Sequence, residues 1–136
     1  MPRKPKALVV DSWAVLAYLG GEAAGQEVAD LITDAHENHI PMHMSVINAG
    51  EVWYILAREI SEVQADAALA DLTGLGVEII NADWPLARMA GIFKARHKMS
   101  YADCFAAALA KDRKGDLVTG DKEFKQIEGE VSIRWL

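Results

Sequence analysis

The chain has 136 residues, of which 51% are hydrophobic and 25% charged, so it carries enough apolar material for one globular domain spanning residues 1–136. Its formal net charge of −6 is unlike that of most nucleic-acid-binding domains, which are basic. One cysteine, Cys104, excludes a disulfide framework. The first apolar run ends at Asp11, and no stretch approaches the roughly 18 apolar residues of a membrane span. We therefore expect a cytoplasmic protein that does not contact a membrane.

Short apolar runs alternate with longer amphipathic segments along the chain. The expected strands are residues 7–10, 40–44, 77–80, 116–119 and 131–135. The expected helices are residues 12–19, 23–38, 45–59, 61–75, 83–98 and 100–113, with a short helical turn at 122–126. This alternation predicts an α/β fold with a parallel sheet that is covered by helices on both faces. Ligands in such folds bind at the carboxyl ends of the strands.

Two acidic residues are expected at this edge of the sheet. Asp11 follows the first strand directly, and Asp121 follows the fourth strand by two residues. Aspartate is also a favoured helix N-cap, so each residue taken alone is explained equally well by capping. Their joint position at the carboxyl edge is what favours a functional site.

Two further acids lie within expected helices. Glu51 shares a helix face with Ile47 and Ile55, and a carboxylate on an apolar face is costly to bury without a partner. The alternative is a glutamate at the helix edge, whose stem packs while its carboxylate reaches water. Asp103 lies three residues after Ser100, as in a capping box, but it also heads a face of small alanines that lets the helix approach the sheet closely.

Four converging carboxylates without cations would repel one another, and a divalent metal resolves that repulsion. Oxygen ligands favour Mg²⁺ or Mn²⁺. The four histidines do not pair with the cysteine at zinc-ligand spacing, and the sequence has no phosphate-binding loop of the Gly-x-x-x-x-Gly-Lys type. The residues therefore indicate a Mg²⁺ or Mn²⁺ site at Asp11, Glu51, Asp103 and Asp121.

Four sequence blocks carry a family resemblance. They are Asp11-Ser12-Trp13-Ala14, the run Ser45 to Val52, Leu86-Ala87-Arg88 leading to the run Ser100 to Ala108, and the run Val118 to Phe124. Together, in this order and spacing, they closely resemble PIN-domain proteins, and within that family the VapC-type toxin ribonucleases of bacterial toxin–antitoxin pairs. The resemblance covers almost the whole chain. It implies a three-layer α/β/α sandwich with a central parallel sheet.

The resemblance also implies a function: a metal-dependent endoribonuclease that hydrolyses RNA phosphodiester bonds, leaving 5′-phosphate and 3′-hydroxyl ends. It implies a homodimer that is inhibited by a small VapB-like antitoxin. The family's acidic residues correspond to Asp11, Glu51, Asp103 and Asp121, as catalytic residues and metal ligands, with Glu51 a further ligand or the group that orients the attacking water. Ser12, Asn48 and Thr119 correspond to its supporting or substrate-orienting residues. Trp13 is bulkier than the residue that many members carry there, and it either shapes the substrate groove or packs in the core.

Two other functions stay open at this point. The same acids would serve a nuclease of the same fold that acts on another nucleic acid, and a substrate panel would distinguish the two. The domain would alternatively be a catalytically silent module that binds a metal or a partner. Basic groups at residues 94–98 and 111–114, and at Arg3, Lys4 and Lys6, either contact phosphates or lie on solvated helix ends.

Overall fold

The structure is a computed structural model that describes residues 4–136, so Arg3 lies outside the described residues. Five parallel strands form one sheet with the order β3-β2-β1-β4-β5. The strands are β1 (Leu8–Val10), β2 (Met42–Ser45), β3 (Val77–Ile80), β4 (Asp116–Thr119) and β5 (Ile133–Trp135). The expected parallel α/β sheet is confirmed. Its central strand, β1, pairs with strands that are far from it in sequence.

Six α-helices and a short 3₁₀ helix connect the strands in the described part of the chain. They are α1 (Ser12–Leu19), α2 (Ala23–Glu37), α3 (Val46–Glu59), α4 (Glu62–Gly74), α5 (Trp84–Arg96), α6 (Tyr101–Asp112) and the 3₁₀ helix η1 (Lys122–Ile127). The hydroxyl or carboxylate of the preceding residue accepts hydrogen bonds from the first turn of α3, α4, α5 and α6. Ser45, Ser61, Asp83 and Ser100 therefore cap these four helices, at the residues where the helices were expected to begin.

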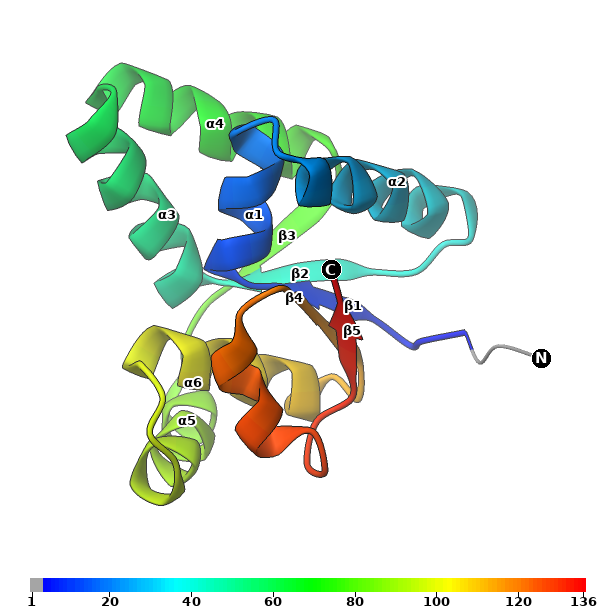
Figure 1. Ribbon diagram of the computed structural model, residues 1–136, viewed down its shortest axis with the longest axis vertical. Coiled ribbons are helices and arrows are strands. Elements are labelled where there is room, and N and C mark those ends of the chain that lie inside the picture. The colour runs from blue at the N-terminus through cyan, green and yellow to red at the C-terminus, as the bar shows by residue number, and fades with distance from the viewer. Residues whose placement is uncertain (1–3) are drawn as a thin grey trace.

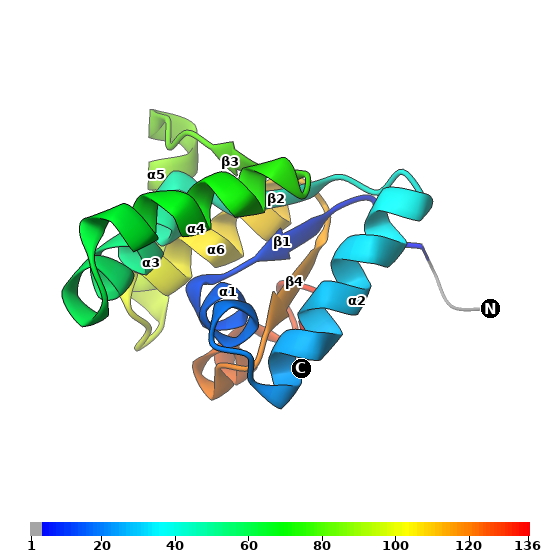
Figure 2. The same ribbon diagram turned by 90° about the horizontal axis from the view of Figure 1, so that it is seen from above.

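The sheet separates two helical layers (Figure 1). Helices α1 to α4 cover one face, where Val10, Met44 and Val52 belong to one buried apolar cluster. Helices α5 and α6 cover the other face, where Val9 and Leu117 join the buried side of α6 in a second cluster. Figure 2 shows α1 and α2 on the same side of the strands from a second direction. This arrangement confirms the three-layer α/β/α sandwich.

Three elements are shorter than their apolar patterns predicted. The helix expected to reach residue 98 ends at Arg96, because His97 adopts an extended conformation with φ −134° and ψ 155°. Strand β2 begins at Met42 rather than at residue 40, and β5 begins at Ile133 rather than at residue 131. The backbone N–H of Val131 instead donates to the carbonyl of Ile127, which keeps the turn after η1 closed. Across the described residues, no helix is long and apolar enough to cross a membrane.

Candidate active site

Asp11 is fully buried at the carboxyl end of β1, and both of its carboxylate oxygens accept hydrogen bonds. Oδ1 accepts from the backbone N–H of Ala14 over 2.8 Å, which caps α1. Oδ2 accepts from the hydroxyl of Thr119 over 2.5 Å, and Thr119 is the last residue of the neighbouring strand β4. The capping role and the position at the sheet edge therefore coexist in one carboxylate, and its orientation is fixed from two sides.

Asp121 is oriented by the same threonine. The Thr119 hydroxyl accepts a hydrogen bond from the backbone N–H of Asp121 over 2.9 Å. Oδ1 of Asp121 in turn accepts from the backbone N–H of Glu123 over 2.9 Å, capping η1. The buried side chains of Phe124 and Ile127 anchor η1 in the second apolar cluster. The turn after β4 thus presents two acids, Asp121 and Glu123, on one short anchored segment.

Three carboxylates meet at this edge of the sheet: Asp103, Asp121 and Glu123 each offer an oxygen within 4.8 Å of the other two. Asp103 is buried in the first turn of α6, where its backbone N–H donates to the Ser100 hydroxyl. The sequence predicted the meeting of Asp103 and Asp121. It did not predict Glu123. The one feature of the sequence that could have indicated this residue is its position two residues after Asp121, in a turn that Asp121 caps.

Burial and mutual repulsion shift two of these acids strongly. Burial raises the pKa of Asp11 to about 7, and the hydrogen bond from Thr119 opposes that rise. Burial raises the pKa of Asp103 to about 8, and a hydrogen bond with the Glu123 side chain and the charges of Asp121 and Asp11 raise it further. These charges place Asp11 in the same electrostatic group as the three carboxylates.

The donor set fits a hard divalent cation. Within residues 4–136, no lysine or arginine forms an ion pair with Asp11, Asp103, Asp121 or Glu123. All of the converging atoms are carboxylate oxygens, which Mg²⁺ and Mn²⁺ prefer as ligands. A bound cation would neutralise the repulsion that raises the pKa of Asp103.

A buried polar network ties three elements together beside the acids. The Asn48 side-chain amide donates to the Ser12 hydroxyl over 3.2 Å and to the carbonyl of Ala102 over 3.1 Å. The Ser12 hydroxyl donates to the Asn48 backbone carbonyl over 3.3 Å. Ala102 directly precedes Asp103, so Asn48 of α3 fixes the first turn of α6 that carries this carboxylate. Ser12, Asn48 and Thr119 are all buried, which favours positioning over direct substrate contact.

Glu51 lies at the edge of the buried face of α3. The buried face of α3 consists of Asn48, Ala49, Val52 and Leu56, whereas Ile47 is 37% exposed. The face that Glu51 shares with Ile47 and Ile55 is therefore only partly buried, because the buried side of α3 is centred on Asn48 and Val52. This agrees with the alternative of a glutamate at the helix edge. Glu51 is half-buried at the boundary, and it is outside the group of three acids within 4.8 Å.

The basic groups at the helix ends are partly engaged locally. Lys94 Nζ donates to the carbonyl of Met99 over 2.7 Å, and Arg113 lies 3.8 Å from the carboxylate of Asp112. His97 pairs with Glu130 over 2.9 Å. These contacts favour a local role at the helix ends for Lys94 and Arg113 over contact with phosphates. The side chains of Arg96 and Lys98 stay exposed.

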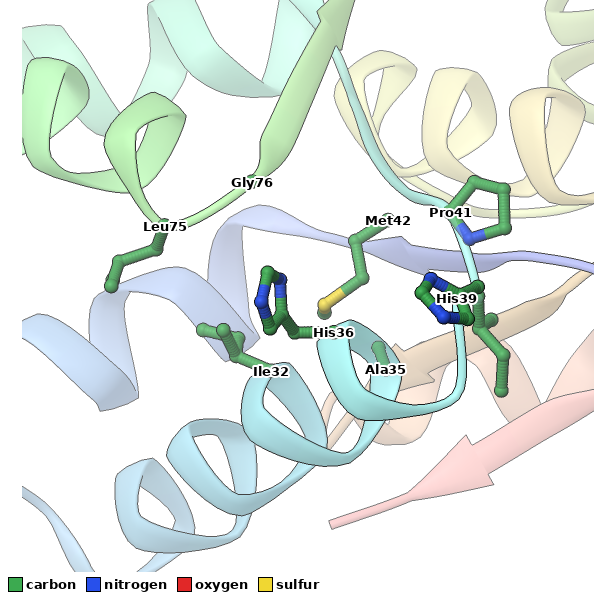
Figure 3. Close-up of a pocket in the computed structure, with 9 residues that line it drawn as sticks. Ile32, Ala35, His36, His39, Pro41, Met42, Leu75 and Gly76 are labelled. Atoms are coloured by element: carbon green, nitrogen blue, oxygen red, sulfur yellow. The ribbon is translucent and has the colours of Figure 1, made fainter.

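A pocket on another part of the molecule is shown in Figure 3. It has a volume of about 290 Å³ and is lined by the end of α2, the start of β2 and the turn between α4 and β3, including His36, His39 and Met42. Because it contacts the amino end of β2, it is at the opposite edge of the sheet from the acids. The acids lie instead at the carboxyl edge, where Asp11 and Asp103 are buried and Glu123 is exposed.

The sequence matches the family model of the PIN domain over residues 8–130. No curated protein sequence matches the chain. Solved structures with a similar fold include VapBC2 from Rickettsia felis bound to a DNA fragment from its promoter, with a TM-score of 0.73, 18% identity, and coverage of 96% of this chain and 98% of that one.

Two further structures have the same fold. VapC20 from Mycobacterium tuberculosis, described as a toxin that cleaves the sarcin–ricin loop, matches with a TM-score of 0.67 and 21% identity over 88% of this chain and 94% of that one. DNA-bound VapBC from Salmonella typhimurium matches with a TM-score of 0.73 and 19% identity over 94% of this chain and 96% of that one.

Proposed function

The chain belongs to the PIN-domain family, and from that premise we propose that it is the toxin of a toxin–antitoxin pair, a Mg²⁺- or Mn²⁺-dependent endoribonuclease of VapC type. The observation that carries the proposal is the cluster of Asp103, Asp121 and Glu123, which lies beside Asp11 with no basic partner in the described chain. The names of the similar structures, among them a toxin that cleaves the sarcin–ricin loop, support RNA as the substrate.

We assign the ligand role to Asp11, Asp103 and Asp121, with Glu123 as an added candidate. When bound, a divalent cation supplies positive charge to the scissile phosphate and lowers the pKa of water. Asp11 is held in place by the Thr119 hydroxyl and the Ala14 amide, so this carboxylate needs little reorganisation to act. Glu51 remains a further ligand or the group that orients the attacking water.

The same comparisons support the proposed antitoxin partner. Several similar structures are VapBC or toxin–antitoxin complexes, which supports a small VapB-like antitoxin as the inhibitor of this chain. A homodimer and a cytoplasmic location are part of the same proposal. Co-expression of the neighbouring reading frame should relieve growth inhibition by this chain, and growth inhibition that persists with the antitoxin present would contradict the pairing.

A substrate panel tests the activity. Purified protein is incubated with single-stranded RNA, structured RNA and DNA of the same sequence, with Mn²⁺, with Mg²⁺ or with EDTA. We expect cleavage of RNA only, dependent on metal, and a loss of about a thousandfold in Asp103→Asn. The matched control is Asp112→Asn, at the exposed end of the same helix.

The other two functions predict different results. Cleavage of DNA with RNA spared would identify a nuclease of the same fold with another substrate. Binding of Mn²⁺ without cleavage of any substrate would identify a silent binding module. Mapping of 5′ ends in cells after brief induction, wild type beside Asp11→Asn, would identify the RNA that is cut.

A further inference from the structure

The indole ring of Trp13 lies directly against Gly120, the residue before Asp121. A Cβ atom at position 120 would lie 2.3 Å from Cη2 and 2.4 Å from Cζ3 of this ring. The glycine is thus required by the close approach of the ring. Trp13 therefore covers the backbone that leads from β4 into the acidic cluster. In the sequence, Trp13 follows Asp11 by two residues, so it connects both parts of the site.

Contact with Gly120 covers only part of the indole ring of Trp13. Trp13 keeps 37% of its surface exposed, although it lies beside the buried Asp11 and Thr119. The indole N–H groups of Trp53 and Trp135 donate to Asp66 and Glu128. That of Trp13 has no partner within residues 4–136. A substantial aromatic surface is therefore exposed at the edge of the acid site, and the indole N–H of Trp13 has no partner from the described chain.

We propose that Trp13 is a nucleobase-binding subsite, on which an unpaired base of the RNA stacks while the adjoining phosphate lies at the acidic cluster. This inference rests on the proposed ribonuclease function and names the form of its substrate, an unstacked single strand or loop. Aromatic side chains bind such bases through stacking that tolerates many sequences. Contact with Gly120 restrains one side of the ring, which reduces the ordering that is needed when a base binds.

The position of the ring favours a nucleotide as its occupant. Trp13 contacts Gly120, the residue that precedes Asp121. A base stacked on the ring would therefore keep the phosphate of the same nucleotide close to the acidic cluster. The free indole N–H suits the carbonyl and phosphate oxygens of a nucleic acid. A segment of a protein partner seated on the ring is the alternative occupant that the experiment tests.

Binding is measured in the Asp103→Asn background with EDTA, so that no RNA is cut. The probes are a fluorescein-labelled RNA hairpin with an unpaired loop and a fully paired RNA duplex of the same length. We expect Trp13→Leu to weaken hairpin binding about tenfold and Trp13→Phe about threefold, with little change for the duplex. The matched control is Trp84→Leu, since Trp84 is 73% exposed but follows β3, three strands from β4.

Cleavage kinetics separate stacking from support of the Gly120 turn. In the active protein, stacking predicts that Trp13→Leu raises KM about tenfold with kcat nearly unchanged. A fall in kcat at unchanged hairpin affinity would overturn the subsite and leave Trp13 as packing only. Equal losses for hairpin and duplex, or weakened antitoxin binding with RNA binding intact, would overturn it as well.

A second variant checks the contact itself. Gly120→Ala must displace the ring, so we expect it to weaken hairpin binding in the Trp13 protein and to have little effect in Trp13→Leu. Equal effects in both backgrounds would contradict the proposed contact. If the wild-type protein cleaves RNA and Trp13→Leu behaves identically, the subsite alone fails; if wild type neither binds nor cleaves RNA, the proposed function fails with it.

Discussion

The hydroxyl of Thr119 donates to Oδ2 of Asp11 over 2.5 Å, joining two residues that are 108 positions apart in the sequence. The Thr119 hydroxyl oxygen also accepts a hydrogen bond from the backbone N–H of Asp121, so the side chain of Thr119 sets the relative positions of the two acids. Hydrogen bonds of this kind around metal ligands orient the ligands and tune their basicity.

Removal of the Thr119 hydroxyl should weaken metal binding. Thr119→Val keeps the shape of the side chain but removes the donor to Asp11 and the acceptor for Asp121. We expect Mn²⁺ affinity to fall about 10–100-fold by isothermal titration calorimetry. Thr119→Ser, which keeps the hydroxyl, should restore most of the affinity. Wild-type affinity in the valine variant would show that the threonine is not needed to orient these ligands.

The metal-free protein should lose stability as the pH rises from 6.5 to 8.5. Asp11 and Asp103 have folded-state pKa values of about 7 and 8, above the unfolded value of 3.8, so the folded state binds more protons in this range. Their stabilising effect is complete below pH 3.8 and is lost as the pH rises through 7 and 8. Burial lowers the pKa of His43, which destabilises the fold only below its usual value of 6.5.

The measurement is urea unfolding in EDTA at both pH values, repeated with Mn²⁺. Because the cation binds the deprotonated carboxylates, Mn²⁺ should raise the free energy of unfolding more at pH 8.5 than at pH 6.5. An unfolding free energy in EDTA that rises with pH across this range would refute the assignment of raised pKa values.

Neutralising Asp103 should stabilise the metal-free protein while it abolishes the response to metal. Asp103→Asn removes a buried charge facing Asp11, Asp121 and Glu123, and the cap from Ser100 is kept because it uses the backbone N–H. At pH 8.5 in EDTA we expect about 1–3 kcal/mol of added stability. Asp112→Asn should show neither effect. A destabilised Asp103→Asn protein would indicate that the carboxylate has a structural partner.

Glu123 should contribute to metal binding although the family resemblance did not assign it. Glu123→Gln keeps the backbone N–H that donates to Asp121 and removes only the charge. We expect about a tenfold loss of Mn²⁺ affinity. The control is Glu27→Gln on the exposed side of α2, which should leave the affinity unchanged. No loss in Glu123→Gln would restrict the site to the aspartates.

Asn48 should matter for both stability and activity. Asn48→Ala leaves the carbonyl of Ala102 and the hydroxyl of Ser12 without a donor in a buried region, which costs about 1–3 kcal/mol. Because the first turn of α6 is then free to shift, kcat should fall more than KM rises. Thermal melting and cleavage kinetics check the two parts. An intact kcat in a destabilised variant would limit Asn48 to folding.

The sequence predicted the elements of the fold because its signals are local. The caps at Ser45, Ser61, Asp83 and Ser100 and the apolar strands are each contained within a few neighbouring residues. The strand order could not be derived in this way, because pairing β1 with β4 depends on contacts across more than 100 residues. The predicted ends of some helices and strands differ from the observed ends by up to two residues. At His97, for example, the change to an extended backbone ends the helix before residue 98.

The candidate site was predictable in part for the same reason. Asp11 and Asp121 were found from their places after buried strands. The two alternatives for Glu51 could not be decided, because helical periodicity alone does not show that the buried side of α3 is centred on Asn48 and Val52. Glu123 was missed because its approach to Asp103 depends on how the 3₁₀ turn packs, through Phe124 and Ile127, against α6.

The central place of β1 also determines when the site comes into existence during synthesis. Asp11 leaves the ribosome early, but Thr119 and Asp121 pair with it only after β4 has been made and inserted beside β1. A contact between residues so far apart cannot form before both of them have been synthesised. A nascent chain of this protein therefore carries no assembled acid site while most of it is being translated.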